Sequence, residues 1–414
     1  MTPTSPTSAP GLSRWLALAI IVLSGVIGIA AWQVYAPAFI AEPVQDWLAY
    51  ETAVQSYFSG DLGLLSDGAR FTAQLNATFA GWLSQPLSLH PWVYPPHFLL
   101  LLLPFGVLPA AAGCVLFQAA SFAGLLAAGW RFAATASRRA GFAAVLVLCP
   151  ATAFNVGVGQ NGFLSGALLL GGFGLLARSP LVAGALLGVL TYKPQLWLMV
   201  PVALIAARQW RALGSAVAVA VTLAVLSGAV FGFEIWRQWL SFAAGDRALY
   251  GAWVEAGRLK GMSVYASASV LGATPAFANI LQAAATAAAA GIVYWTQRQS
   301  AMSEGLRIAV ILAATILAAP HVSNYDCVLL AVAAALVLIH ALDHGFRLGE
   351  LIAGISVWAW PLFNPPSVFR AGLATPLLIV LFMAAVIARA RADAAMSSQA
   401  SSLTCTSSPI TRTG

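Results

Sequence analysis

Residues 16–34, LALAIIVLSGVIGIAAWQV, decide the fold of this chain, because the run carries no charge and is long enough to cross a bilayer as a helix. The run is also too long and too weakly flanked for a cleaved signal peptide. Similar runs follow along the sequence. Hydrophobic residues make up 60% of the chain, charged residues only 8%, and the mean hydropathy is +0.85, whereas soluble domains carry roughly 25% charged residues. We therefore predict an all-α polytopic membrane protein, since helices satisfy their own backbone amides in lipid.

One polar interruption, residues 37–95, separates the first apolar run from the others. Its acidic residues outnumber its arginine five to one, and it is rich in aromatic residues. The charged residues are Glu42, Asp46, Glu51, Asp61, Asp67 and Arg70, and the aromatic ones include Trp47, Tyr50, Tyr57, Trp82, Trp92 and Tyr94. Functional side chains gather in loops that a rigid scaffold positions. We expect this segment to be a functional loop outside the bilayer.

The net charge of +7 indicates an orientation and gives no reason to expect a nucleic-acid partner. The basic residues recur in short loops, which the positive-inside rule assigns to the cytoplasm. These residues are Arg14, Arg178, Arg208, Arg211, Arg298, Arg307, Arg347, Arg389 and Arg391. This assignment places residues 37–95, the longer loop 233–267, and the turns at Lys193 and His321 on the outer side.

The same reading gives about twelve spans in a membrane domain of residues 14–391. Residues 97–130 count as one net crossing and residues 181–207 as two short ones. The opposite assignment also gives twelve but exposes three arginines outside, namely Arg131, Arg138 and Arg139. Residues 1–13 and 392–414 are predicted to be disordered cytoplasmic ends. The cysteines show no metal or redox spacing and are interpreted as packing residues.

Four polar clusters interrupt the apolar runs, and all four fall on the predicted outer face. They are Gln45-Asp46-Trp47; Asn155 with Gly159-Gln160-Asn161; Tyr192-Lys193-Pro194-Gln195; and Pro320-His321 with Asn324-Tyr325-Asp326. Polar groups at membrane depth are costly, so those that persist are candidates for function. Their convergence on one face points to a single site.

Each cluster also has a structural interpretation. Asp46 could cap a helix at the interface, and Gln160 with Asn161 could satisfy backbone groups at a helix end. Lys193 could extend its ammonium to the membrane surface without further function. His321 and Asp326 could form a hydrogen-bonded pair that only ties two helices together.

The motifs, taken in order, resemble glycosyltransferase family 87. The resemblance begins with Asp46-Trp47-Leu48-Ala49-Tyr50, Ser59-Gly60 and Tyr94-Pro95-Pro96, with Pro104 and Leu108-Pro109. It continues through Asn155, Gly159-Gln160-Asn161-Gly162, Ala183-Gly184, Gly188 and Tyr192-Lys193-Pro194-Gln195. It ends with Arg208-Gln209-Trp210-Arg211, Gly261-Met262-Ser263-Val264-Tyr265, Pro320-His321 and Tyr325-Asp326. One departure is Ala266-Ser267-Ala268-Ser269, where similar sequences tend to carry an arginine.

The resemblance implies a polytopic GT-C bundle in a bacterial inner membrane, with an active site that faces the periplasm. The donor would be a polyprenyl-phosphate sugar, mannose in the family, and the acceptor a hydroxyl of a lipid or glycan. The catalytic base of the first external loop corresponds to Asp46. Substrate-binding residues would be Tyr94, Asn155, Gln160, Asn161, Gln195, His321, Tyr325 and Asp326.

The chemistry of such a transfer assigns roles to the charged residues. Phosphate is a good leaving group, so the enzyme mainly needs a base for the acceptor proton and cations for the phosphate. Lys193 is expected to hold the phosphate, with help from Arg258 or Lys260 in the 233–267 loop. One carboxylate acting as base, with no second one as nucleophile, implies inversion at C1.

Two questions stay open at this stage. No dedicated metal cage is evident, although Asp46 and Asp326 could share one divalent cation. The alternative function is a membrane transporter or lipid flippase, because transporters place ionisable groups on broken helices such as the one at Lys193-Pro194.

Overall fold

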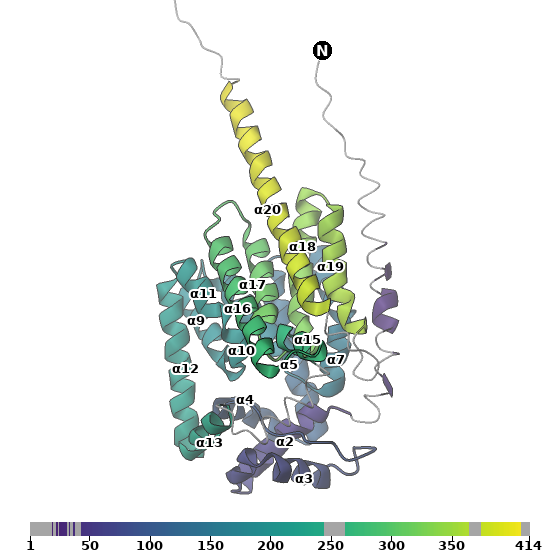
Figure 1. Cartoon of the computed structure of the whole chain (residues 1–414), viewed down its shortest axis with the longest axis vertical. Coiled ribbons are helices and arrows are strands. Elements are labelled where there is room, and N and C mark those ends of the chain that lie inside the picture. Colours follow the sequence, from purple (N-terminus) through teal and green to yellow (C-terminus); the bar gives the residue numbers. More distant parts are fainter. Residues whose placement is uncertain are drawn as a thin grey trace, which may run out of the picture.

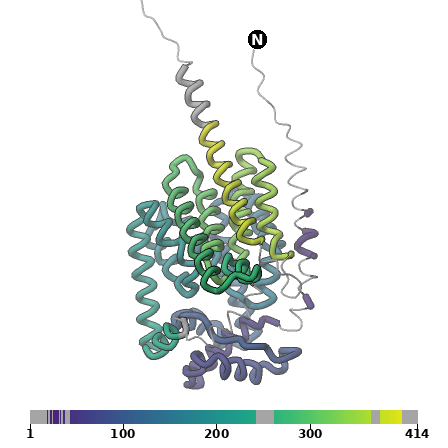
Figure 2. The backbone as a smooth tube through the Cα atoms, viewed as in Figure 1, coloured from purple at the N-terminus to yellow at the C-terminus, as the bar shows by residue number. Residues whose placement is uncertain are grey.

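The computed structural model describes residues 43–243, 261–363 and 374–406, together with short pieces between residues 19 and 37. Within these ranges every regular element is a helix and none is a strand, which confirms the all-α class. The helices form one bundle capped at one end by a layer of shorter helices (Figures 1 and 2). Arg258 and Lys260, residues 1–13 and nine of the nineteen residues of the first apolar run lie outside the described residues.

Four described helices are long and apolar enough to cross a membrane. They are α5 (Ala110–Trp130), α12 (Trp210–Phe231), α16 (Pro275–Gln297) and the continuous helix Asn324–His344, which joins η3 (Asn324–Cys327) to α18 (Val328–His344). A fifth candidate is the pair α6 (Ala136–Val147) and α7 (Pro150–Val158), which meet at a bend of 60°. The count of about twelve stays a prediction.

Shorter apolar helices fill the rest of the bundle. They are α4 (Pro96–Gly106), α8 (Gly162–Leu175), α9 (Pro180–Val189) with η2 (Leu190–Tyr192), α10 (Pro194–Trp197), α11 (Met199–Ala206), α15 (Val264–Val270), α17 (Glu304–Ala318) and α19 (Leu348–Ala359) with η4 (Trp360–Phe363). Proline begins several of them, since its fixed φ suits the first turn and its missing N–H costs nothing there. Residues 97–130 therefore form two helices, of which only α5 is of spanning length.

The polar segment after residue 43 is itself helical. It contains α2 (Gln45–Phe58), η1 (Leu62–Ser66) and α3 (Gly68–Thr78). These elements lie at the lower end of the bundle in Figure 1, where α13 (Glu234–Ala243) also lies after the long helix α12. The two segments predicted to be external loops thus meet at one end of the molecule.

The opposite end is held by a buried ionic cluster. Arg389 on α20 (Thr375–Thr406) is 1% exposed and contacts Glu350 of α19 at 2.6 Å. It also contacts Asp393 at 2.9 Å, and His340 of α18 reaches Asp393 at 2.8 Å. Helix α20 continues to Thr406, so residues 392–406 are helical where the sequence predicts a disordered tail.

Helices α9 and α12 approach each other at glycines. A Cβ on Gly184 would lie 2.1 Å from the carbonyl oxygen of Ala212, and one on Gly188 would lie 2.5 Å from that of Ala216. Small residues at helix interfaces let backbones approach closely, which drives helix association where lipid removes the hydrophobic term. These glycines are therefore required by close packing.

We predict that Gly184→Ala lowers the thermal midpoint of the protein in detergent, because the added methyl overlaps backbone that cannot move independently. The cost of such overpacking is about 1–3 kcal/mol. Gly214→Ala on α12 is the matched control, since a Cβ there meets nothing within 4 Å. The control should keep or raise the midpoint, as alanine is the better helix former. Equal midpoints for both variants would contradict the packing argument.

Candidate active site

The site begins where α2 starts against the turn that follows α7. The backbone N–H of Val44 donates to the carbonyl of Gly157 at 2.9 Å, and Val44 has a positive φ of 47°. Gly159 closes α7 with a φ of 73°, and a Cβ there would lie 2.6 Å from the Cβ of Trp47. Glycine allows both this φ and this contact. The first turn of α2 is thereby fixed on the α7–α8 connection.

Asp46 lies in that first turn, but no side-chain hydrogen bond caps the helix. Its carboxylate Oδ1 instead lies 3.0 Å from Nε2 of His90. The Asp46 side chain is 17% exposed, so it is sheltered but still reachable from solvent. The capping interpretation of Asp46 is therefore wrong, and its partner is a histidine that the sequence analysis did not identify.

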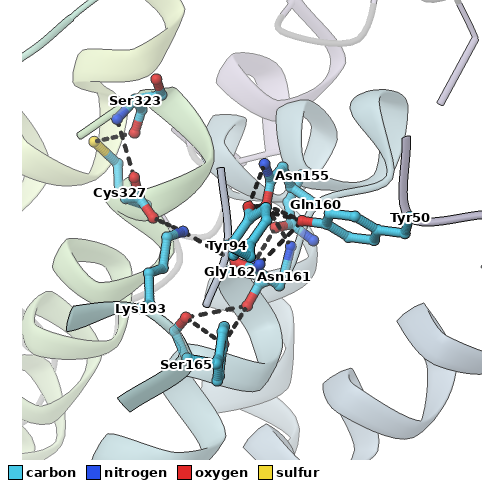
Figure 3. A network of polar contacts seen from close by, with 12 residues as sticks. Tyr50, Tyr94, Asn155, Gln160, Asn161, Gly162, Ser165, Lys193, Ser323 and Cys327 are labelled. Carbon is cyan, nitrogen blue, oxygen red and sulfur yellow. Dashed lines mark hydrogen bonds and ion pairs between the residues drawn. The ribbon is translucent and has the colours of Figure 1, made fainter. Parts of the chain in front are cut away.

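One turn after Asp46, the hydroxyl of Tyr50 enters a cluster of amides. It donates to Oε1 of Gln160 at 2.7 Å, accepts from Nδ2 of Asn161 at 3.0 Å, and lies 2.9 Å from the hydroxyl of Tyr94 (Figure 3). Gln160 Nε2 donates to the Tyr94 hydroxyl at 3.1 Å. Gln160 and Asn161 are 4% and 0% exposed. Such a network rigidifies its members because each is held by several partners.

Asn155 supports this cluster from behind. Its Oδ1 accepts from the backbone N–H of Gly162 at 2.8 Å, and its Nδ2 donates to Oε1 of Gln118 at 2.8 Å. Gln118 in turn donates to the carbonyl of Gln160 at 2.7 Å. Asn155 and Gln118 therefore satisfy backbone groups at the α7–α8 turn, and Gln118 is a member that the sequence analysis missed. Of the two residues in the structural interpretation, Gln160 accepts from the backbone N–H of Asn161 at 2.9 Å, whereas the Asn161 side chain contacts Tyr50 and Lys193.

Lys193 and Asp326 form a buried ion pair. The Nζ of Lys193 is 2.6 Å from Oδ1 of Asp326 and donates to Oδ1 of Asn161 at 2.9 Å (Figure 3). The two side chains are 3% and 2% exposed. Lys193 also lies 4.9 Å from the ring centroid of Tyr325. The Lys193 ammonium therefore does not reach the surface, and the interpretation as an interfacial lysine is wrong.

The local backbone explains why both groups lie there. Proline at position 194 keeps Lys193 out of helical geometry, with φ −126° and ψ 75°, and begins α10. Asp326 lies in the capping box of η3, where its Oδ2 accepts from the backbone N–H of Ser323 at 3.0 Å. A helix break and a helix start thus bring opposite charges together from two segments of the chain.

A cavity of about 130 Å³ opens beside this pair. Six predicted site residues line it, namely Tyr94, Lys193, Gln195, His321, Tyr325 and Asp326. Asp46, Asn155, Gln160 and Asn161 are not among its lining residues, and the three amides hold its wall from behind. Burial lowers the pKa of His321, because desolvation disfavours the charged imidazolium. The expected pairing of His321 with Asp326 stays a prediction.

A family model for glycosyltransferase family 87 matches residues 92–323, more than half of the chain. The chain belongs to glycosyltransferase family 87. No curated protein and no solved structure matches it. Membership confirms the resemblance and supports a membrane-embedded glycosyltransferase over a transporter or flippase.

The matched region of this family 87 protein covers most of the cavity wall. It includes Tyr94, Gln160, Lys193 and His321, begins after Asp46 and ends just before Asp326. The geometry therefore extends the site on both sides of the match. Asp326 contacts Lys193, which lies inside the match, and Asp46 contacts His90, which lies just before it.

No group of three or more histidine, cysteine, aspartate or glutamate side chains in the described ranges could hold a metal ion. Asp46 contacts His90, and Asp326 contacts Lys193. The idea that Asp46 and Asp326 share a divalent cation stays a prediction.

We predict that Lys193→Met alone lowers the free energy of unfolding by about 3–5 kcal/mol, because it leaves the Asp326 charge buried and unpaired. The double variant Lys193→Met, Asp326→Leu should recover most of that loss, since neither charge then needs solvation. Thermal midpoints in detergent for both single variants and the double variant measure the coupling. Losses that simply add in the double variant would contradict the pairing.

Proposed function

We propose that this protein transfers a sugar, mannose by family resemblance, from a polyprenyl-phosphate donor to a hydroxyl of a lipid or glycan acceptor. The reaction would take place on the periplasmic side of the bacterial inner membrane. The observation that carries the proposal is a cavity with a lysine, a histidine, an aspartate and four tyrosines in its wall, in a chain of family 87.

Lys193 fits the role of phosphate ligand as a hydrogen-bond donor. An ammonium has three N–H groups, and two of them are directed to Asn161 and Asp326. The third is left for a donor phosphate oxygen. Because Asp326 balances the lysine charge, the site need not hold an isolated cation in a buried region.

Asp46 fits the role of general base through its position beside the cavity wall. It precedes Tyr50 by one turn of α2, and Tyr50 contacts the cavity residue Tyr94 at 2.9 Å. Burial raises the pKa of Tyr94, the charge of Lys193 opposes this rise, and the charge of Asp46 adds to it. The charges of Asp46 and Lys193 therefore both act on the hydroxyl of Tyr94.

The transfer follows as a single displacement. Asp46 takes the proton from the acceptor hydroxyl while the acceptor oxygen forms a bond to C1 of the sugar. The bond from C1 to the phosphate oxygen breaks, and the lipid phosphate leaves with the negative charge that Lys193 stabilises. One displacement inverts the configuration at C1.

We predict that Asp46→Asn reduces transfer by about a hundredfold or more, the scale of general-base removal. The amide keeps the size of the side chain, so the thermal midpoint in detergent should change little. The assay uses purified protein, a polyprenyl-phosphate-linked mannose and extracted membrane lipids or glycans as acceptors. Near-normal turnover of the Asn variant would rule out Asp46 as the base.

His321 should contribute to acceptor binding or proton transfer. We predict that His321→Ala reduces transfer at least tenfold, with little change in thermal midpoint, since general acid–base groups contribute on the order of a hundredfold or more. Gln195→Ala is the comparison variant, because it alters the same cavity without removing an ionisable group. A parallel fall of activity and midpoint in the His321 variant would indicate a structural role instead.

A further inference from the structure

The loop between α3 and α4 is fixed to α3 by two side chains on one face of that helix. Asn76 donates from Nδ2 to the carbonyl of Leu87 at 3.0 Å and accepts from its N–H at 2.9 Å. One turn earlier, Oγ1 of Thr72 accepts from the backbone N–H of His90 at 2.9 Å. Residues four apart in a helix face the same way, so the two bonds hold the loop along α3.

This attachment brings the His90 imidazole to Asp46. Nε2 of His90 lies 3.0 Å from Oδ1 of Asp46, and the two side chains are 26% and 17% exposed. A different acid–base pair in the same region, Arg70 with Asp61, is also 3.0 Å apart, but its side chains are 60% and 50% exposed. The His90–Asp46 contact is therefore sheltered, whereas the neighbouring pair lies in solvent.

The residues that follow His90 continue into the site. Trp92 is 6% exposed, and its ring centroid lies 6.4 Å from that of Tyr50 and 5.4 Å from that of Tyr94. Helix α2 contributes Asp46 and Tyr50, and the loop contributes His90, Trp92 and Tyr94. Helix α2 and this loop thus contact each other along several residues, and the His90–Asp46 contact lies closest to the start of α2.

We infer that His90 is the positioning residue of Asp46 in the proposed transfer. In the proposed transfer Nε2 of His90, 3.0 Å from Oδ1, carries the proton and fixes the rotation of the carboxylate, so that Oδ2 takes the acceptor proton. The inference rests on the proposed function, because it assigns His90 a role only through Asp46.

The need for such a partner follows from the freedom of an aspartate side chain. The terminal torsion of aspartate has broad minima, so an unpartnered carboxylate samples many orientations. A hydrogen bond to a charged oxygen is short and strong, and it fixes the direction of the remaining lone pairs. Misplacing a reacting group by about 1 Å costs up to a hundredfold in rate.

The test compares His90→Leu with His90→Gln. Leucine cannot donate to Asp46, whereas the glutamine amide can. We expect His90→Leu to lower kcat by roughly tenfold to a hundredfold with KM for the lipid donor unchanged. His90→Gln should recover most of that loss. Arg70→Leu is the matched control and should leave kcat unchanged, because the exposed pair that it breaks lies outside the proposed machinery.

The outcomes separate this inference from the proposed function. Full kcat in His90→Leu, or equal losses in both His90 variants together with a lower thermal midpoint, would overturn the positioning role while Asp46→Asn still abolishes transfer. Full activity of Asp46→Asn would overturn the proposed base, and the role of His90 with it. A loss in the leucine variant, recovered in the glutamine variant at constant midpoint, supports the inference.

Discussion

The ion pair between Lys193 and Asp326 is the constraint on which the site depends. A lysine buried to 3% exposure could not stay charged without a partner, because desolvation disfavours the ammonium. The carboxylate of Asp326 is that partner, with Oδ1 at 2.6 Å from Nζ of Lys193. The side-chain oxygen of Asn161 also accepts a hydrogen bond from Nζ at 2.9 Å. Every element that touches this pair must therefore be held in place, and the rest of the site shows how this is done.

Three helix ends meet at the pair, and each ends for a local reason. The turn between α7 and α8 presents Asn161, the break before Pro194 presents Lys193, and the capping box of η3 presents Asp326. Backbone groups at helix ends have no partner within the helix, so polar side chains can form contacts there. The breaks are thus what allow a polar site to exist within an apolar bundle.

Much of this could be predicted from the sequence, because polar residues in apolar runs are rare enough to stand out. The helical class and the polar clusters at Asn155–Asn161, Lys193 and Asp326 followed from composition and order, and the family followed from the resemblance of the motifs. The partners could not be predicted. Lys193 and Asp326 are separated by 133 positions, and no local pattern indicates that Lys193 pairs with Asp326 or Asp46 with His90. His90 itself lies in a polar segment, where a histidine carries no signal of burial.

The separate partners of the two principal charges also explain how the site could hold a base and a cation together. Asp46 and Lys193 do not pair with each other. Each has a partner of its own, His90 and Asp326. Asn161 links Tyr50 to Lys193, since its Nδ2 donates to the Tyr50 hydroxyl and its Oδ1 accepts from Nζ of Lys193. In the proposed transfer, Lys193 would meet the donor phosphate within the cavity, and Asp46, which does not line the cavity, would act from the side of Tyr50.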